Sequence, residues 1–513
     1  MRSHKKVQEF LEEVNEQIRY RPMCAVIDEE LVAHIEDKAE LYKEYGIQEE
    51  DAVSRAVRDM GDAMEIGLQM NATHHTRIKW PLLGLTLFFV LLGVLENLRW
   101  SMWGSWDLMA FVEGLVDSSY YLVGLLAMAV MVWQGYPFII RHVKKICIGY
   151  LVLGVTVLIT SRLTGQFYEE LSTLIPNYAG FRISHTVFFG VLLLSAPVMA
   201  VFAYRQRHAG RKGLCLTAGF VAVLFLMQSA FSYGTYLYMA ILAVLLTFLV
   251  TLLYMNHRDY LSLPQKQGYI LTVLLFVVLI GCWGLSQSTG RNKDEAGKTQ
   301  LSRTMELFLT PERQAATTWE DGYNAVIIKE LLSRAELIGP VELTEQELYD
   351  YATGAWYYGE GKEAVWAEDH FLSFEENKEY LDQFISLETV TLEDTLPQHY
   401  HNNYRIAYWI LKYGWIPGLL LLGSIAAFGI LLIRVSIRIR NRLGRLVAFA
   451  GSICLLIQYL FYILGNFGHQ FAWFGNLPFL SEGIVSITVN GILLGLVLSA
   501  YRYDLVMEEK LEN

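Results

Sequence analysis

The stretch GNLPFLSEG, residues 475–483, holds a lone carboxylate, Glu482, between two long apolar runs near the C-terminus. Loops between membrane helices are usually polar and flexible, whereas this one combines a rigid Leu-Pro-Phe with small residues. Pro478 restricts the backbone and removes a hydrogen-bond donor, and Gly475 and Gly483 allow turns on each side. The stretch predicts a shaped turn, in which Glu482 is either a solvated loop charge or part of an acidic site.

Arginines and histidines near the ends of the apolar runs could also do chemistry. Arg182 and Arg405 can bind phosphate through their guanidinium groups, although positive groups at a membrane interface more often contact lipid headgroups without specificity. His399, His401 and His469 could bind a metal ion, but they follow no metal-ligand spacing, and surface histidines are the simpler interpretation. We predict no metal site and no certain cofactor, with a divalent cation left as an option.

The elements that position these residues are predicted to be membrane helices. Just over half of the chain is hydrophobic, and much of it lies in nearly uncharged windows long enough to cross about 30 Å of hydrocarbon. Carboxylates are nearly absent from these windows, which disfavours an ion-coupled transporter. We therefore predict an all-α polytopic membrane protein with about ten transmembrane helices. They are residues 80–98, 118–136, 146–161, 184–204, 212–231, 234–255, 268–287, 412–434, 445–465 and 483–503.

Basic clusters predict the orientation of these helices. They follow the second, fourth and eighth apolar runs, at residues 141–145, 205–212 and 434–445. The positive-inside rule places them on the cytoplasmic side with both termini, and places the large loop 288–411 outside. The net charge of −11 comes mainly from this loop and the N-terminal segment, so it gives no indication of nucleic-acid binding.

The large loop and the N-terminal segment each show helical spacing. In the loop, NAVIIKELLSRAEL (324–337) puts apolar residues near one face, which predicts a partly folded cap. Residues 1–78 predict a small cytosolic module of three helices, with a break at Gly61-Asp62, that serves packing or dimerisation. The predicted inward residues are Val326, Ile327, Leu331 and Leu332 in the loop, and Val7, Phe10, Leu11, Val14, Ile18, Ala52, Ala56, Val57 and Met60 in the module.

The order of these features resembles the FtsW/RodA/SpoVE (SEDS) family, which builds peptidoglycan glycan strands from lipid II. The local matches are residues 78–94, 135–153, 303–327 and 396–422, and the C-terminal NFG…GNLPFLSEG…N at 466–490. Together they imply a transmembrane domain over 79–513 with its large loop between the seventh and eighth spans. The N-terminal segment resembles the helical permease-prefix (HAAS-type) module, through Glu29-Glu30-Leu31, His34-Ile35, Asp37 and Met60-Gly61-Asp62.

The resemblance implies a catalytic chemistry. Polymerising a lipid-linked sugar requires a base that deprotonates an acceptor hydroxyl and positive groups that stabilise the leaving diphosphate. The family's base is an Asp shortly before Gly-Tyr-Gln, and here the Asp-Pro pair that carries it is missing, so the nearby carboxylates Glu312, Glu320 and Asp321 are the candidates. Asp321 is nearest to Gly322-Tyr323 and is the predicted base; the alternative is that all three are exposed loop charges. The predicted substrate-binding residues are Arg182, Arg405, Tyr323, Asn403, Pro478, Ser481 and Glu482.

Several other carboxylates of the family pattern are replaced here. The family pattern has Thr-Asp-Phe where this chain has Asn402-Asn403-Tyr404, and it has Glu-Glu where this chain has Leu411-Lys412. The scaffold glycines and prolines of the pattern remain. This pattern indicates a divergent member of the family. The leading hypothesis is a lipid II polymerase in a bacterial plasma membrane that serves division or cell shape with a transpeptidase (penicillin-binding protein) as partner. The alternatives are a non-catalytic scaffold for wall-synthesis partners and, least favoured, a transporter or lipid flippase.

Overall fold

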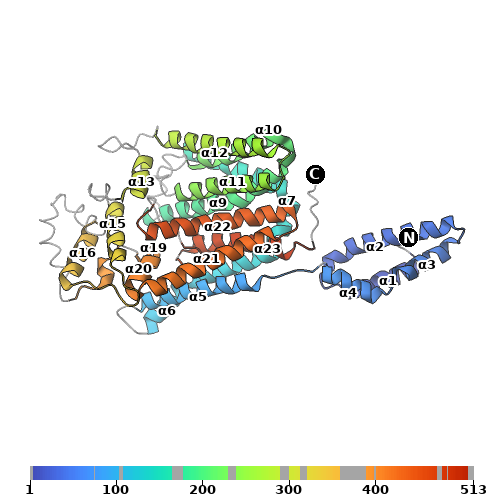
Figure 1. The fold of residues 1–513 in the computed structure, drawn as a ribbon, viewed down its shortest axis with the longest axis horizontal. Coiled ribbons are helices and arrows are strands. Elements are labelled where there is room, and N and C mark those ends of the chain that lie inside the picture. Colours follow the sequence, from blue (N-terminus) through green and yellow to red (C-terminus); the bar gives the residue numbers. More distant parts are fainter. Residues whose placement is uncertain are drawn as a thin grey trace.

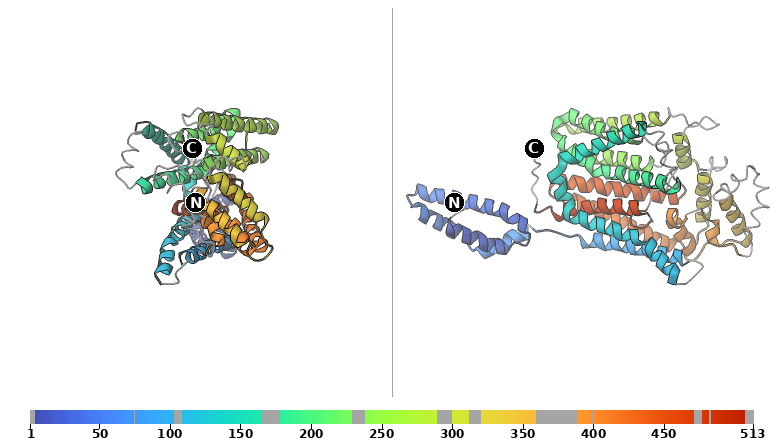
Figure 2. Two further views of the ribbon diagram at one scale, coloured as in Figure 1. Left: turned by 90° about the vertical axis from the view of Figure 1, so that its left-hand side faces the viewer. Right: turned by 180° about the vertical axis from the view of Figure 1, so that it is seen from behind.

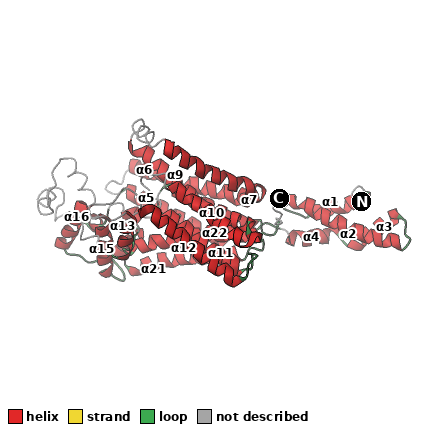
Figure 3. Cartoon of the chain, turned by 90° about the horizontal axis from the view of Figure 1, so that it is seen from above, coloured by secondary structure: helices red, strands yellow, loops and turns green. Residues whose placement is uncertain are grey.

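The protein was analysed as a computed structural model, and the regular structure in its described part is helical, without a β-strand (Figure 3). The predicted all-α fold of a multi-pass membrane protein is confirmed. The structure describes residues 4–73, 75–102, 108–163, 177–228, 238–288, 300–311, 320–358, 389–397, 400–470, 477–481 and 483–506.

Long helices form a bundle, with a separate helical unit beyond one end and short helices at the other, which we call the loop end (Figures 1 and 2). The bundle helices are α5 Trp80–Ser101, α6 Leu108–Asp117, α7 Ser119–Leu163, α9 Asn177–Arg205, α10 Gly210–Gln228, α11 Tyr238–His257, α12 Gln265–Ser288, α21 Trp415–Ile437, α22 Arg442–Asn466 and α23 Ile484–Arg502. A short 3₁₀ turn, η2 Arg207–Ala209, joins α9 to α10.

Seven helices in the described part are long and apolar enough to cross a membrane, or up to eight if the bent pair Phe189–Arg205 with Arg207–Val223 is one span. The ten predicted runs overlap the bundle helices, but two of them share α7 and two more form this bent pair.

The 45 residues of α7 leave helical geometry at His142, between the two predicted runs. A straight helix of that length would measure roughly 68 Å, more than twice the hydrocarbon thickness. Pro137 lies just before the kink, and a proline removes one helical hydrogen bond there.

The burial of the helices separates the centre of the bundle from its lipid-facing side. In α22 and α23, 72% of the membrane-spanning window is buried, against 33% in α5 and α21 and 22% in α12. Large apolar side chains are exposed on the outer helices, among them Leu91, Ile270 and Leu420. Such a surface would be unfavourable in water and is suited to lipid tails.

Helix α23 packs closely along α7 because glycines line the contact. A Cβ on Gly491 would lie 2.5 Å from the carbonyl oxygen of Gly124, and one on Gly495 would lie 2.6 Å from the Cβ of Met131. Small residues four apart let membrane helices approach at backbone distance. This contact sets the position of α23, and with it the turn that precedes α23.

The N-terminal unit contains four helices in the described part, because the predicted third helix is divided at Gly61-Asp62. They are α1 Lys5–Glu16, α2 Cys24–Glu44, α3 Glu49–Met60 and α4 Ala63–Thr73, with a 3₁₀ turn η1 Arg21–Met23. The five apolar residues predicted in the first helix are all buried. Of the four predicted in the third, Ala52 and Ala56 are buried, and Val57 and Met60 are partly buried.

The connection from this unit to the bundle is fixed by an ion pair. The Arg77 guanidinium lies 2.6 Å from the Asp504 carboxylate, which is fully buried. Asp504 also accepts hydrogen bonds from the backbone N–H groups of Arg440 and Asn441. The Tyr20 ring packs against Tyr503, with ring centres 5.9 Å apart. One buried carboxylate therefore joins the linker, the end of α23 and the α21–α22 connection.

The large loop forms helices that cover the loop end (Figure 1). They are α13 Gln300–Leu309, α15 Glu320–Ser333, α16 Glu345–Tyr358, η4 Leu392–Thr395, α19 Tyr400–Asn403 and α20 Arg405–Tyr413. Of the residues predicted to face inward in α15, Ile327, Leu331 and Leu332 are buried, and Val326 is partly buried.

Candidate functional site

The segment Leu477–Ser481 is a buried turn directly before α23. The Ser481 hydroxyl accepts a hydrogen bond from the Leu477 N–H at 2.9 Å, and the Tyr459 hydroxyl donates to the Pro478 carbonyl at 2.9 Å. Phe479 has φ +66°, which is rare for a bulky residue. Such a conformation costs on the order of 1–3 kcal/mol and persists only where surrounding contacts enforce it. The turn therefore has a defined backbone conformation that the surrounding contacts hold, as the sequence GNLPFLSEG predicts.

Arg405 connects this turn to the segment that returns from the large loop. Its Nη1 donates to the Leu480 carbonyl, and its Nε donates to the His401 carbonyl at 2.8 Å. The Tyr121 hydroxyl of α7 donates to the same Leu480 carbonyl at 2.8 Å. Arg405 is only 2% exposed. The arginine predicted to bind substrate thus lies inside the packing, where it positions the turn.

Asn466, the last residue of α22, joins the same two segments. Its side-chain oxygen accepts from the N–H groups of Ile406 and Ala407, each at 3.0 Å. Its amide nitrogen donates to the carbonyls of Asn403 and Tyr462, at 3.0 and 2.9 Å. The first N–H groups of a helix have no partner within that helix. Asn466 therefore caps α20 from another helix and uses all of its side-chain hydrogen-bonding capacity.

The start of the large loop meets the chain just after α22. An N–H at His469 Nδ1 donates to the Phe308 carbonyl of α13 at 2.9 Å, and the rings of the two residues contact each other. At Gly468, φ is +79° and an added Cβ would lie 2.6 Å from the Ala325 carbonyl of α15. Only a glycine suits that backbone and that spacing. Helices α13 and α15 are thus held against the segment that leads to the buried turn.

A network of charged groups and tyrosines lies between α5 and α20. Arg99 pairs with Glu96 at 3.0 Å and donates to the Tyr408 hydroxyl at 3.1 Å. The Tyr408 hydroxyl accepts from Lys412 at 2.8 Å and donates to Glu393 at 2.9 Å, and Lys412 pairs with Glu393. Burial raises the pKa of the Glu393 carboxyl, but the Lys412 ammonium and the Tyr408 hydroxyl outweigh it and hold the pKa below its ordinary value. A carboxylate held in this way is a weak base.

The structure describes the backbone of two of the three candidate catalytic carboxylates. Glu320 and Asp321 open α15, one helical turn before Ala325, which meets Gly468. Their side chains, and Glu312 altogether, lie outside the described residues. Their role as a base stays a prediction.

The predicted substrate-binding residues that the structure describes belong to several different segments. Tyr323 is half-buried in α15, and the Asn403 carbonyl accepts from Asn466. Pro478 and Ser481 belong to the buried turn. Arg182 lies in α9 with its side chain outside the described residues, and Glu482 is also outside them. Their role in substrate binding stays a prediction.

Two of the three histidines considered as metal ligands, His401 and His469, have other contacts. His401 stacks on Trp100 with ring centres 4.4 Å apart, His469 meets Phe308, and His399 lies outside the described residues. Among the residues that the structure describes, no group of three or more His, Cys, Asp or Glu side chains is placed to hold a metal ion.

Sequence reasoning missed the network around Tyr408. One signal could have found it, because Glu96 and Arg99 are a charged pair three residues apart at the end of an otherwise apolar helix. Charges in that position usually need partners. The partners of Arg99 beyond its own helix, Tyr408 and Tyr413 of α20, are more than 300 residues away in the chain, so local spacing does not reveal them.

Comparisons with known proteins leave the family open. No known protein family matches the chain, and no curated protein matches it. One solved structure, described as "Structural coordination of polymerization and crosslinking by a peptidoglycan synthase complex", shares 15% sequence identity at a TM-score of 0.47. The match covers 83% of this chain and 98% of that chain. Because a TM-score below 0.5 does not establish a common fold, we base the function on this chain's own residues.

Proposed function

We propose that the protein polymerises a lipid-linked peptidoglycan precursor, lipid II, at the loop end of its bundle, in a bacterial plasma membrane, during division or cell-shape maintenance. One observation carries this proposal. Three segments resemble the loop and the C-terminal signature of the FtsW/RodA/SpoVE family, residues 303–327, 396–422 and 466–490, and the third of them contacts the other two there. Phe308 bonds His469, and Arg405 bonds Leu480.

The location suits a substrate of this kind. Lipid II has an apolar tail that stays in the bilayer and a charged diphosphate that stays at its surface, so its sugar reacts at the membrane boundary. The buried turn directly precedes the membrane helix α23, and α20 directly precedes α21. Both are therefore expected at the level of that boundary, next to the cap formed by α13 and α15.

In the proposed reaction, the oxygen of the acceptor hydroxyl forms a bond to the anomeric carbon, and the bond from that carbon to the diphosphate breaks. Asp321 takes the proton that the hydroxyl loses. Positive groups, or a divalent cation, stabilise the leaving diphosphate. The support for Asp321 is its place in the first turn of α15, which is held against the segment leading to the buried turn. The hydrogen bonds of Arg405 and Asn466 fix the positions of the buried turn and of α20 beside it.

The test is polymerisation of labelled lipid II by the purified full chain, with a divalent cation and with or without a transpeptidase partner. Asp321→Ala should lower the rate by about a hundredfold or more, the range for a general base. Asp350→Ala, which removes an exposed carboxylate of α16 in the same loop, is the matched control and should stay close to wild type. Equal rates for all three proteins would exclude Asp321 as the base and leave Glu312, Glu320 and Glu482 as candidates.

A second candidate is a non-catalytic scaffold that recruits wall-synthesis enzymes. It is favoured by Glu96 and Glu393, two carboxylates of the network between α5 and α20, because each is already paired with a cation of the protein. Under this alternative, correctly folded protein would bind a transpeptidase but would form no polymer under any condition. Polymer made by the protein alone would exclude it.

A further inference from the structure

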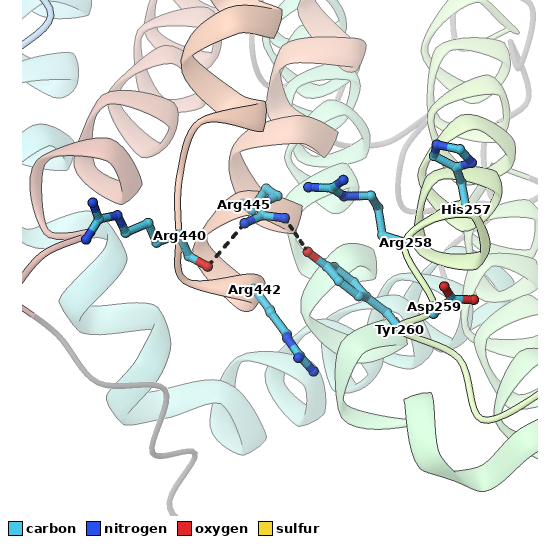
Figure 4. A pocket seen from close by; sticks show the side chains of 7 residues that line it. All are labelled: His257, Arg258, Asp259, Tyr260, Arg440, Arg442 and Arg445. Carbon is cyan, nitrogen blue, oxygen red and sulfur yellow. Dashed lines mark hydrogen bonds between the residues drawn. The ribbon is translucent and has the colours of Figure 1, made fainter.

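A basic cavity lies at the end of the bundle opposite the loop end, away from the site described above. It has a volume of about 380 Å³ and is formed by the end of α11 and the start of α22. Figure 4 shows the residues around it. They are His257, Arg258, Asp259, Tyr260, Arg440, Arg442 and Arg445.

Local structure gives this cavity a fixed wall. Asn441 caps α22, since its side-chain oxygen accepts from the Gly444 N–H at 2.9 Å. Arg445 donates to the Ile439 carbonyl at 2.6 Å and to the Tyr260 hydroxyl at 2.9 Å. Tyr260 is 7% exposed. Arg445 and Tyr260 therefore form a braced wall that joins α22 to the chain after α11.

The remaining arginines around the cavity have no carboxylate partner in the part of the chain that the structure describes. Arg258, Arg440 and Arg442 are exposed, and within the described residues no carboxylate lies within ion-pair distance of any of the three or of Arg445. Asp259 is the one acidic residue of the lining, and its carboxylate accepts from Gln265 at 2.8 Å. With four arginines and one aspartate, the formal charge of the lining is +3.

The side chains differ in where they point (Figure 4). Arg258 points toward Arg445, whereas the guanidinium of Arg440 points away from both. Arg442 lies 5.8 Å from the centre of the Tyr260 ring. Two guanidinium groups that point toward each other repel, so an anion between them would be favoured. The Tyr260 hydroxyl accepts from Arg445, which leaves its own proton to donate.

We propose that this cavity binds the phosphate group of an anionic ligand, either the headgroup of a membrane phospholipid or a soluble phosphate compound. Arginine forks match phosphate oxygens, and the positive end of the α22 dipole adds to the field because α22 begins at Arg442. The cavity is within the size range of small-ligand sites, roughly 300–1,000 Å³. It also lies at the ends of two membrane-spanning helices, where phospholipid headgroups lie.

The test compares two double variants that lose the same charge. R258Q/R442Q removes two exposed arginines from the cavity, and R434Q/R438Q removes two exposed arginines from the end of α21 outside it. Purified, delipidated full-length protein in an uncharged detergent is titrated with dioleoyl-phosphatidylglycerol, and in a separate arm with inorganic phosphate and diphosphate. Bound ligand is counted by native mass spectrometry. All four side chains are exposed, so both variants should fold.

We expect the affinity for the ligand that binds to fall about tenfold in R258Q/R442Q and roughly twofold or less in R434Q/R438Q, because only the cavity arginines bond the phosphate directly. If phosphatidylglycerol shows this pattern, the ligand is a lipid headgroup. If only the inorganic anions show it, the site binds a soluble phosphate. Equal losses in the two variants would mean a general effect of net charge, and binding of neither probe would mean no site. Either result overturns the proposal.

Discussion

Asn466 is the residue at which the loop-end site can be tested most directly. Its side chain caps α20 through the N–H groups of Ile406 and Ala407 and is fully buried. Asn466→Ala removes the acceptor and leaves two buried donors without a partner. Asn466→Asp keeps an acceptor for both donors but no longer donates to the Asn403 carbonyl. The two variants therefore separate the capping bonds from the rest of the contact.

The expected loss of folding stability in each variant follows from these hydrogen bonds. An unsatisfied buried donor costs about 1–3 kcal/mol, so two of them give an expected loss of about 2–6 kcal/mol for Asn466→Ala. Asn466→Asp leaves one carbonyl unsatisfied and places a negative group at the start of α20, where the helix dipole favours it. We expect it to cost about 1–3 kcal/mol. Gln346→Ala, on the exposed face of α16, should change stability by less than about 0.5 kcal/mol.

Two measurements would check the expected ranking of the three variants by loss of stability. Equilibrium unfolding in mixed detergent micelles gives the free energy of each variant, and amide hydrogen exchange of the peptide that contains α20 reports whether the loss is local. Exchange should increase in α20 first, because its own N–H groups lose their acceptor. A loss for Asn466→Ala no larger than that of Gln346→Ala, with unchanged exchange in α20, would refute the capping argument.

Two further predictions concern the same end of the bundle. The folded-state pKa of Glu393 is below its ordinary value of 4.5, so the stability that this carboxyl contributes is complete above pH 4.5 and is lost as the pH falls through the lower, folded-state pKa. Glu393→Gln should lack that acid-dependent loss, and unfolding curves from about pH 6 to about pH 3 check it; equal pH dependence in both proteins would contradict it. Gly468→Ala should cost about 1–3 kcal/mol and raise amide exchange in α15, because φ is positive and the added Cβ meets the Ala325 carbonyl. Gly423→Ala, whose Cβ would meet nothing within 4 Å, is the control, and no difference between the two would contradict the contact.

Much of the helical framework could be predicted because it depends on local patterns. An apolar window long enough to cross the bilayer identifies a membrane helix whatever it packs against, and the stripe from Val7 to Ile18 identifies a buried face. The kink at His142 could not be predicted in the same way, since both sides of it read as ordinary spans. The number of spans therefore depends on geometry that hydropathy does not contain.

The candidate site could be located from the sequence, but the roles of its residues could not. GNLPFLSEG predicts a shaped turn, and Leu477–Ser481 forms one. The burial of Arg405 depends on Leu480 and His401, and the low pKa of Glu393 depends on Lys412. Contacts of this kind join segments that are far apart in the chain, so they follow from the fold and leave no mark in local spacing.

The arginines at the two ends of the bundle show why composition alone does not identify an anion site. Arg405 already donates to two carbonyls inside the protein, and a phosphate there would have to replace those bonds and displace the turn that they hold. Arg258 and Arg442 are exposed, and no described carboxylate pairs with them. A phosphate in the basic cavity would add bonds and break none. For this reason we expect Arg405 to affect the proposed polymerisation by positioning the turn, and we expect direct phosphate binding by arginine at the opposite end of the bundle.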